Sequence, residues 1–155
     1  MAFESYHAIK NMRTGNIGTC AVKLDMHKAY DRVEWKFLKL IMIQLGFEVE
    51  WVDLIMACVT SVCYQVQMNQ SLSEYITPTR GLRQGDPLSP YLFLLCAEGL
   101  TSLILHEEEQ GNRQGVKVCH NAPSISHLLF ADDSLILMRA DRNNALSLKH
   151  DLDDY

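Results

Sequence analysis

Phe130-Ala131-Asp132-Asp133 is the stretch that decides the fold, and an apolar run over residues 135–138 follows it after Ser134. A second apolar run, residues 125–130, precedes the two aspartates. Both runs are short and β-prone, so the pattern predicts strand, tight turn, strand, with the Asp pair at the tip. Adjacent side chains point to opposite faces of a strand, so both carboxylates cannot be buried in one core. At a hairpin tip they could bind a hard divalent cation, whereas taken alone they also fit an Asp-rich surface turn.

Composition narrows the class of protein. The chain has 155 residues, 48% of them hydrophobic and 21% charged, which is typical of one globular domain. Its net charge of −5 argues against a freestanding nucleic-acid binder, which usually carries a basic face. The five cysteines are odd in number and form no C-x-x-C pair, which favours reduced thiols over disulfides or a zinc site.

The sequence also bears on localisation. Its first residues contain no apolar signal core, and the longest apolar run, residues 91–97, is too short to span a bilayer. We therefore expect a soluble, intracellular protein, nuclear or cytoplasmic, that is not secreted and does not bind a membrane.

Periodicity and capping residues predict an α+β fold, with helices layered on an antiparallel sheet. Asp31 and Glu34 fit a capping box that opens a helix, Ser89 fits the N-cap of a long helix with Pro90 after it, and Asp141 fits the cap of a last helix. The predicted elements are a strand over 20–25, a helix ending before Gly46, a helix over 48–60, a hairpin over 62–77, a helix from 90 to 109, a strand over 115–119, the Asp-Asp hairpin and a helix after 141.

Three carboxylates could meet at one edge of the predicted sheet. Asp25 ends one strand, while Asp132 and Asp133 lie at the tip of the hairpin. If these strands are neighbours, their carboxylates converge, and without nearby His or Cys they favour Mg²⁺ or Mn²⁺ over zinc. Such a cluster can hold two ions roughly 3.5–4 Å apart for an in-line phosphoryl displacement. The glycine-containing loop over residues 80–90 leads into a helix, where a nucleotide or template strand could approach closely.

Three segments resemble the A, B and C motifs of reverse transcriptases: KLDMHKAYD at 23–31, GLRQGDPLSP at 81–90 and FADD at 130–133. Their form is that of LINE-type retrotransposons lacking long terminal repeats, particularly those of plants. The motifs occur in the family's order, and the resemblance covers roughly residues 20–140. It implies a right-hand polymerase palm and RNA-directed DNA polymerase activity.

The resemblance also implies a metal site. Asp25 and Asp132 would be the principal ligands of two Mg²⁺ or Mn²⁺ ions, and Asp133 would be the third acidic residue. The carbonyl of Met26 is a further candidate ligand.

Five other positions would contact the nucleotide or the template. Tyr30 would be the aromatic gate that stacks under the deoxyribose and excludes a 2′-hydroxyl, although a core aromatic at a helix start is the simpler alternative. Gln84, Gly85 and the neighbouring Pro87 would lie against the incoming nucleotide and template. Arg83 is a candidate phosphate contact.

By this resemblance the partners are an RNA template, a DNA primer and a dNTP. Residues 1–19 would be a remnant of the fingers, 20–140 the palm core, and 141–155 the start of a truncated palm helix. Fingers and thumb would be missing, so we expect the chain to be inactive alone. Two alternatives stay open: a non-catalytic retrotransposon remnant or interaction module, and another two-metal palm enzyme such as a nucleotide cyclase or phosphohydrolase.

Overall fold

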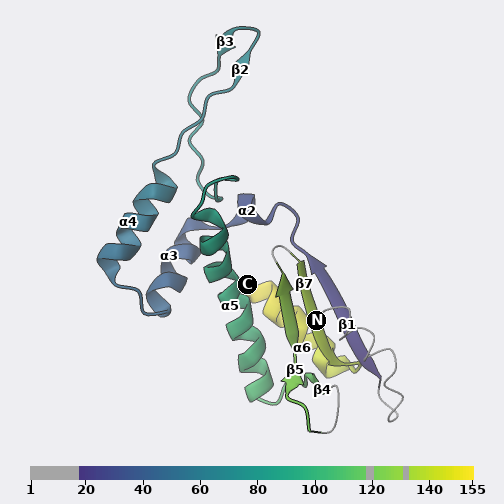
Figure 1. Ribbon diagram of the computed structural model, residues 1–155. Coiled ribbons are helices and arrows are strands. Elements are labelled where there is room, and N and C mark those ends of the chain that lie inside the picture. Colours follow the sequence, from purple (N-terminus) through teal and green to yellow (C-terminus); the bar gives the residue numbers. More distant parts are fainter. Residues whose placement is uncertain (1–17, 118–120, 131–132) are drawn as a thin grey trace. The chain divides into compact units, whose positions relative to one another are not determined.

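The computed structural model describes residues 18–117, 121–130 and 133–155 (Figure 1). The described chain combines helices with antiparallel sheets, in runs of helices and runs of strands, which confirms the predicted α+β class. The elements are β1 (Thr19–Asp25), α2 (Ala29–Arg32), α3 (Trp35–Gln44), α4 (Val49–Thr60), β2 (Gln67–Met68), β3 (Ser71–Leu72), α5 (Ser89–Glu109), β4 (Val116–Lys117), β5 (Ser124–Ile125), β6 (His127–Phe130), β7 (Asp133–Arg139) and α6 (Arg142–Asp154).

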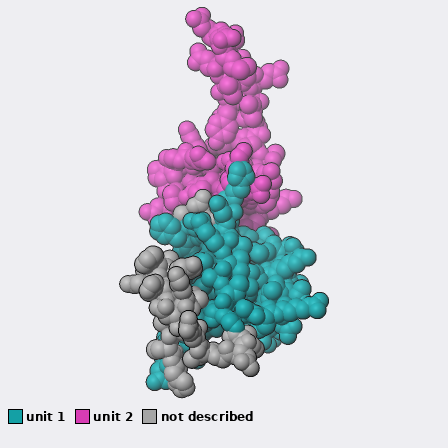
Figure 2. Space-filling view, turned by 90° about the vertical axis from the view of Figure 1, so that its right-hand side faces the viewer, with its two compact units in different colours: residues 1–27, 97–155 teal, residues 28–96 magenta. Residues whose placement is uncertain are grey.

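The chain divides into two compact units, coloured separately in Figure 2. One unit comprises residues 1–27 with residues 97–155, and it holds the strands β1, β6 and β7. The other comprises residues 28–96, with the helices α3 and α4 and the loop that leads into α5.

The first unit is built on a three-stranded antiparallel sheet in the order β1-β7-β6. β7 is the central strand and pairs with both β1 and β6. The strand that ends at Asp25 therefore lies beside the Asp-Asp hairpin, as predicted. Phe130 pairs with Asp133 across the hairpin, and residues 131–132 between them lie outside the described residues.

One face of this sheet is buried under the two helices of the same unit. Ile136 and Met138 of β7 pack with Leu100 and Ile104 of α5 and with Leu148 of α6. Full burial of one such side chain contributes about 1.5–3 kcal/mol, so this cluster accounts for much of the unit's stability.

A buried ion pair joins the end of α5 to α6. The Arg113 guanidinium donates to Asp151 Oδ2 at 2.6 Å and to the Ile104 carbonyl at 2.8 Å, and the two charged side chains are 0% and 2% exposed. Burial raises the pKa of the Asp151 carboxyl, and the Arg113 hydrogen bond partly offsets that rise. The pair therefore fixes α6 at the cost of desolvating two charges.

The predicted capping box at Asp31 and Glu34 is wrong. Asp31 lies inside the short helix α2, and α3 begins at Trp35 with an extended Glu34 before it that caps no backbone N–H. The reason is a tertiary contact: the carbonyl of Val33 accepts a hydrogen bond from the Gly81 N–H at 2.8 Å. Val33 is held out of helical conformation, so one predicted helix becomes two.

Other boundaries differ less from the prediction. Ser89 is the first residue of α5 rather than the cap before it. In the turn before the helix, the Asp86 carboxylate accepts from the Leu88 N–H at 2.8 Å. Asp141 caps α6 as predicted, accepting from the Asn144 N–H at 2.9 Å. The predicted hairpin over 62–77 forms as β2 and β3, with Asn69 and Gln70 in left-handed conformation at its turn.

Among the described residues, α5 is long and apolar enough to cross a membrane by length and composition alone. Polar residues interrupt its apolar sequence, so no single apolar run marks it as a possible span. Leu92, Phe93, Cys96, Leu100 and Ile104 of this helix are buried within the protein. One face of α5 is therefore part of the protein core.

Candidate active site

Two of the predicted metal ligands face each other at one edge of the sheet. Asp25 is the last residue of β1 and Asp133 the first of β7, and they are direct partners in the antiparallel register. Directly opposite residues point to the same face with Cβ atoms about 4.5–5.5 Å apart, and like charges in such a pair are destabilising. Such a pair of carboxylates is stabilised when a positive charge lies beside it.

Lys23 lies beside this pair of carboxylates. It precedes Asp25 by two residues on β1, so both side chains project from the same face of the sheet. Its Nζ forms an ion pair with Asp133 Oδ1 at 2.9 Å, and both side chains remain well exposed.

The donor set fits a divalent cation. Carboxylate oxygens are the ligands that Mg²⁺ and Mn²⁺ prefer, and Asp25 and Asp133 are direct partners in the strand register. Three or more His, Cys, Asp or Glu side chains that could share a metal are not found within the described part of the chain. Asp132, the predicted third carboxylate, lies outside that part. Met26 is partly buried against the core of the same unit.

In the second unit, the predicted glycine loop pairs with the segment that joins α2 to α3. The Gly81 and Leu82 N–H groups donate to the carbonyls of Val33 and Tyr30, each at 2.8 Å, and the Trp35 indole donates to the Gly81 carbonyl at 2.8 Å. Motif A and motif B are therefore joined through their backbones.

Gly81 is needed for this contact. Its φ is +94°, and a Cβ added there would lie 3.1 Å from the Asp31 carbonyl oxygen and 3.2 Å from the Asp31 Cα. Gly46 has a similar φ of +89° with open space around it. Both glycines adopt a conformation that costs other residues energy, but only Gly81 is also closely packed against backbone.

We expect Gly81→Ala to lower the free energy of unfolding by about 1–3 kcal/mol more than Gly46→Ala, because crowding adds to the shared backbone strain. Chemical denaturation of both variants measures the difference. Equal losses would show that the approach of motif B to Asp31 is not tight in solution.

Tyr30 is half-buried and stacks on Phe93 of α5. The ring centroids are 5.0 Å apart and the planes differ by 12°. This contact holds the Tyr30 ring in a defined orientation, as both the packing role and the gate role require. Phe93 is a supporting residue that the sequence analysis did not identify, because nothing in the spacing links it to Tyr30.

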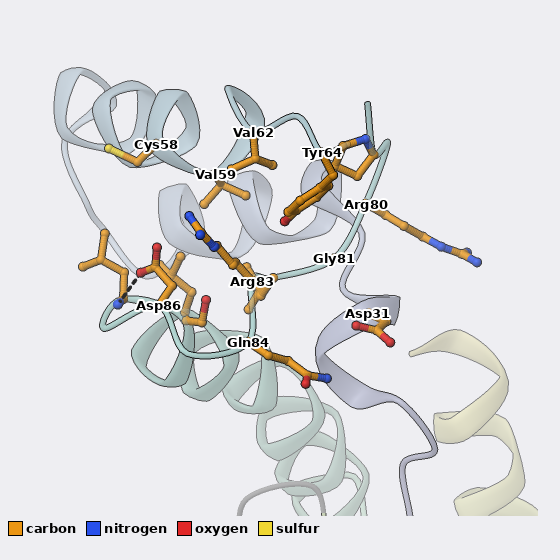
Figure 3. A pocket seen from close by; sticks show the side chains of 15 residues that line it. Asp31, Cys58, Val59, Val62, Tyr64, Arg80, Gly81, Arg83, Gln84 and Asp86 are labelled. Carbon is orange, nitrogen blue, oxygen red and sulfur yellow. Dashed lines mark hydrogen bonds between the residues drawn. The ribbon is translucent and has the colours of Figure 1, made fainter. Parts of the chain in front are cut away.

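A pocket of about 510 Å³ opens beside the glycine loop (Figure 3). Arg83, Gln84 and Asp86 line it from the loop, and Val59 and Tyr64 contribute apolar and aromatic surface. In Figure 3 the Arg83 side chain extends toward α4, while Arg80 extends the other way, where it forms an ion pair with Glu34 at 3.2 Å. The pocket is of small-ligand size and combines a cation with apolar and aromatic walls.

The remaining predicted contacts are in the same loop. Gly85 has a φ of +83° with no atom within 4 Å of an added Cβ, so its backbone is open to an approaching molecule. Pro87 is exposed next to it. The roles of these residues, like those of Arg83 and Gln84, stay predictions.

Comparison with known proteins agrees with this geometry. The family model for reverse transcriptase (RNA-dependent DNA polymerase) matches residues 1–154. An uncharacterized mitochondrial protein of Arabidopsis thaliana is 61% identical over 59 residues, covering 38% of this chain and 48% of that protein. The Pol polyprotein of the type-1 retrotransposable element R2 from Popillia japonica is 30% identical over 131 residues, covering 84% of this chain and 21% of the polyprotein.

Among solved structures, apo telomerase of Candida tropicalis matches with a TM-score of 0.64 at 13% identity, over 98% of this chain and 30% of that one. This likeness supports the predicted polymerase-palm fold. The chain spans about half the length of the Arabidopsis relative and about a fifth of the R2 polyprotein.

The fold is thus that of a polymerase palm. The chain belongs to the reverse transcriptase (RNA-dependent DNA polymerase) family. The similarity to R2 confirms the LINE-type class that the motifs predicted, and the Arabidopsis match agrees with a plant-type sequence. Reverse transcriptases generally use divalent metal ions. The alternative functions, a cyclase, a phosphohydrolase or an interaction module, are not favoured by these matches.

Proposed function

We propose that this chain provides the palm of an enzyme that transfers a nucleotide from a dNTP to the 3′-hydroxyl of a DNA primer on an RNA template. The direct pairing of Asp25 with Asp133, at the ends of the motif A and motif C strands, is the observation that carries the proposal. The chain is an RNA-directed DNA polymerase by family, and Asp25 of motif A and Asp133 of motif C lie opposite each other at the end of one sheet.

In this mechanism Asp25, Asp132 and Asp133 would hold two Mg²⁺ or Mn²⁺ ions, and the Met26 carbonyl would be a further ligand. When bound, the ions stabilise the attacking and leaving oxygens of the in-line displacement. The carboxylates supply the negative charge that draws the cations to the sheet edge, where the primer terminus and the triphosphate must meet.

The residues of the glycine loop orient the substrates. Arg83 contacts a phosphate, and Gln84, Gly85 and Pro87 lie against the incoming nucleotide and the template strand. Tyr30 lies under the sugar, held by its stack on Phe93. Binding and alignment of this kind can supply roughly 7–11 kcal/mol of the barrier.

The partners that follow from this proposal are the RNA template, the DNA primer and the dNTP. An enzyme with these substrates would act inside the cell, in the nucleus or the cytoplasm. The proposed reaction needs no membrane.

Metal binding is the first test. Mg²⁺ or Mn²⁺ should raise the melting temperature of the chain by mass action, and should do so more weakly for Asp132→Ala. In the absence of metal, the same substitution should not lower the melting temperature, because it relieves repulsion among carboxylates. Melting curves against metal concentration, at fixed ionic strength, measure both effects. An identical metal response in parent and variant would contradict a shared site.

The second test concerns Tyr30 in a complete reverse transcriptase that carries this palm. Tyr30→Val should admit ribonucleotides, because a smaller side chain leaves room for the 2′-hydroxyl. A steric penalty of about 1–3 kcal/mol corresponds to roughly ten- to a hundredfold lost discrimination between dNTP and rNTP. Single-nucleotide incorporation rates measure the ratio. An unchanged preference would leave Tyr30 with the packing role alone.

A further inference from the structure

Among the described residues at the paired ends of β1 and β7, Lys23 is the one cationic side chain beside the carboxylates. Lys23, Asp25 and Asp133 project from the same face, and Lys23 Nζ forms an ion pair with Asp133 Oδ1 at 2.9 Å. The next pair along this face is Lys23 opposite Leu135, so the lysine stands between the carboxylates and the apolar part of the face.

In the metal-free protein, Lys23 offsets the repulsion between the carboxylates of Asp25 and Asp133. Two carboxylates directly opposite each other repel, and before a metal ion binds no metal charge compensates this repulsion. A lysine two residues along the same strand can reach the opposing carboxylate diagonally, because diagonal neighbours in an antiparallel pair lie within reach of long side chains. Lys23 makes this diagonal contact.

We propose that Lys23 is a positioning residue that acts as the resident counter-ion of the Asp25–Asp133 pair and competes with the catalytic metal for Asp133. Without metal, the ammonium group neutralises Asp133 and keeps the ends of β1 and β7 paired. When metal binds, Asp133 exchanges its contact with Lys23 for one with the ion. This inference rests on the proposed function, since it assumes that the metal binds at this edge.

The competition has a definite direction. Because Lys23 occupies an acceptor oxygen and places a positive charge beside the site, its removal should make the metal bind more tightly. Exposed ion pairs contribute little, so the expected gain is about two- to fivefold in the metal concentration at half-saturation. The metal-free protein should change the opposite way and become less stable.

The chain offers a matched control. Lys39 Nζ lies 2.7 Å from Asp53 Oδ1 in an exposed ion pair that involves neither motif A nor motif C. Lys23→Met and Lys39→Met therefore remove the same group from comparable ion pairs, and only the first faces a second carboxylate. Lys23→Arg keeps the positive charge and should behave like the parent chain.

The experiment is a set of melting curves for the full chain against MnCl₂ at constant ionic strength, with the parent, these three variants and Asp25→Asn. We expect Lys23→Met to lower the metal-free melting temperature by about 1–4 °C more than Lys39→Met. It should also move the Mn²⁺ midpoint about two- to fivefold lower, while Lys39→Met and Lys23→Arg leave it unchanged.

Two different failures can be told apart. If Asp25→Asn weakens the Mn²⁺ response but Lys23→Met leaves the midpoint where it is, the metal site stands and the role of Lys23 is overturned. If the parent shows no Mn²⁺ response, or Asp25→Asn responds as the parent does, the metal site itself fails, and the inference fails with it.

Discussion

Arg113→Met lowers the free energy of unfolding by about 3–5 kcal/mol, because it leaves the Asp151 carboxylate buried without its partner. The guanidinium and the carboxylate are fully enclosed, so neither can recover its hydration when the other is removed. The loss should exceed that of Arg80→Met, which breaks an exposed ion pair with Glu34. Equilibrium denaturation of the two variants measures the difference.

A second substitution separates pairing from packing. In Arg113→Met/Asp151→Leu both charges are gone, so most of the lost stability should return. The single variant should also regain part of its stability at low pH. Burial raises the pKa of Asp151, so the folded state binds the proton more readily than the unfolded state, and the cost of the lone carboxylate disappears as it becomes protonated. If Arg113→Met is no worse than Arg80→Met, the buried ion pair is not formed in solution.

Asp25→Asn should have the largest effect on activity. In a reverse transcriptase carrying this palm, it removes one charged ligand of the metal ions, whose contribution to the barrier is several kcal/mol. A loss of about 4 kcal/mol corresponds to a rate lowered roughly a thousandfold. Folding should be unaffected or slightly improved, because Asp25 is exposed and faces a like charge.

Single-turnover incorporation of one dNTP on an RNA template measures this effect, and Asp53→Asn is the matched control. Asp53 is likewise an exposed aspartate, but it pairs with Lys39 and lies on α4, outside the three motifs. A rate for Asp25→Asn within a few fold of the control would remove Asp25 from the catalytic machinery.

The sheet edge could be predicted from the sequence because local pattern and chemistry agree there. An apolar strand that ends on Asp25 and a hairpin tipped by Asp132 and Asp133 suggest one sheet with one polar end, and the register confirms it for Asp25 and Asp133. The large separation of these residues along the chain does not prevent this prediction, because the ends of two strands lie together whenever the strands pair.

Other features depend on contacts that no local pattern encodes. Val33 is drawn out of helical conformation by the Gly81 N–H, a partner 48 positions away, so the capping-box prediction failed. Arg113 belongs to a residue type that is seldom buried, and only the folded structure reveals its partner Asp151. The contact between Lys23 and Asp133 could have been suspected from the two-residue spacing of Lys23 and Asp25, once the strand register was known.

The central claim is that the carboxylates of motifs A and C form one metal site, and Mn²⁺ binding followed by electron paramagnetic resonance tests it most directly. Free Mn²⁺ gives a strong signal that weakens on binding, so titration of the chain counts bound ions without relying on activity or stability. The account predicts saturable binding to the parent chain and to Asp53→Asn, and strongly weakened binding to Asp25→Asn and to Asp132→Ala alike. Equal binding by all four proteins, or no binding by the parent, would contradict it.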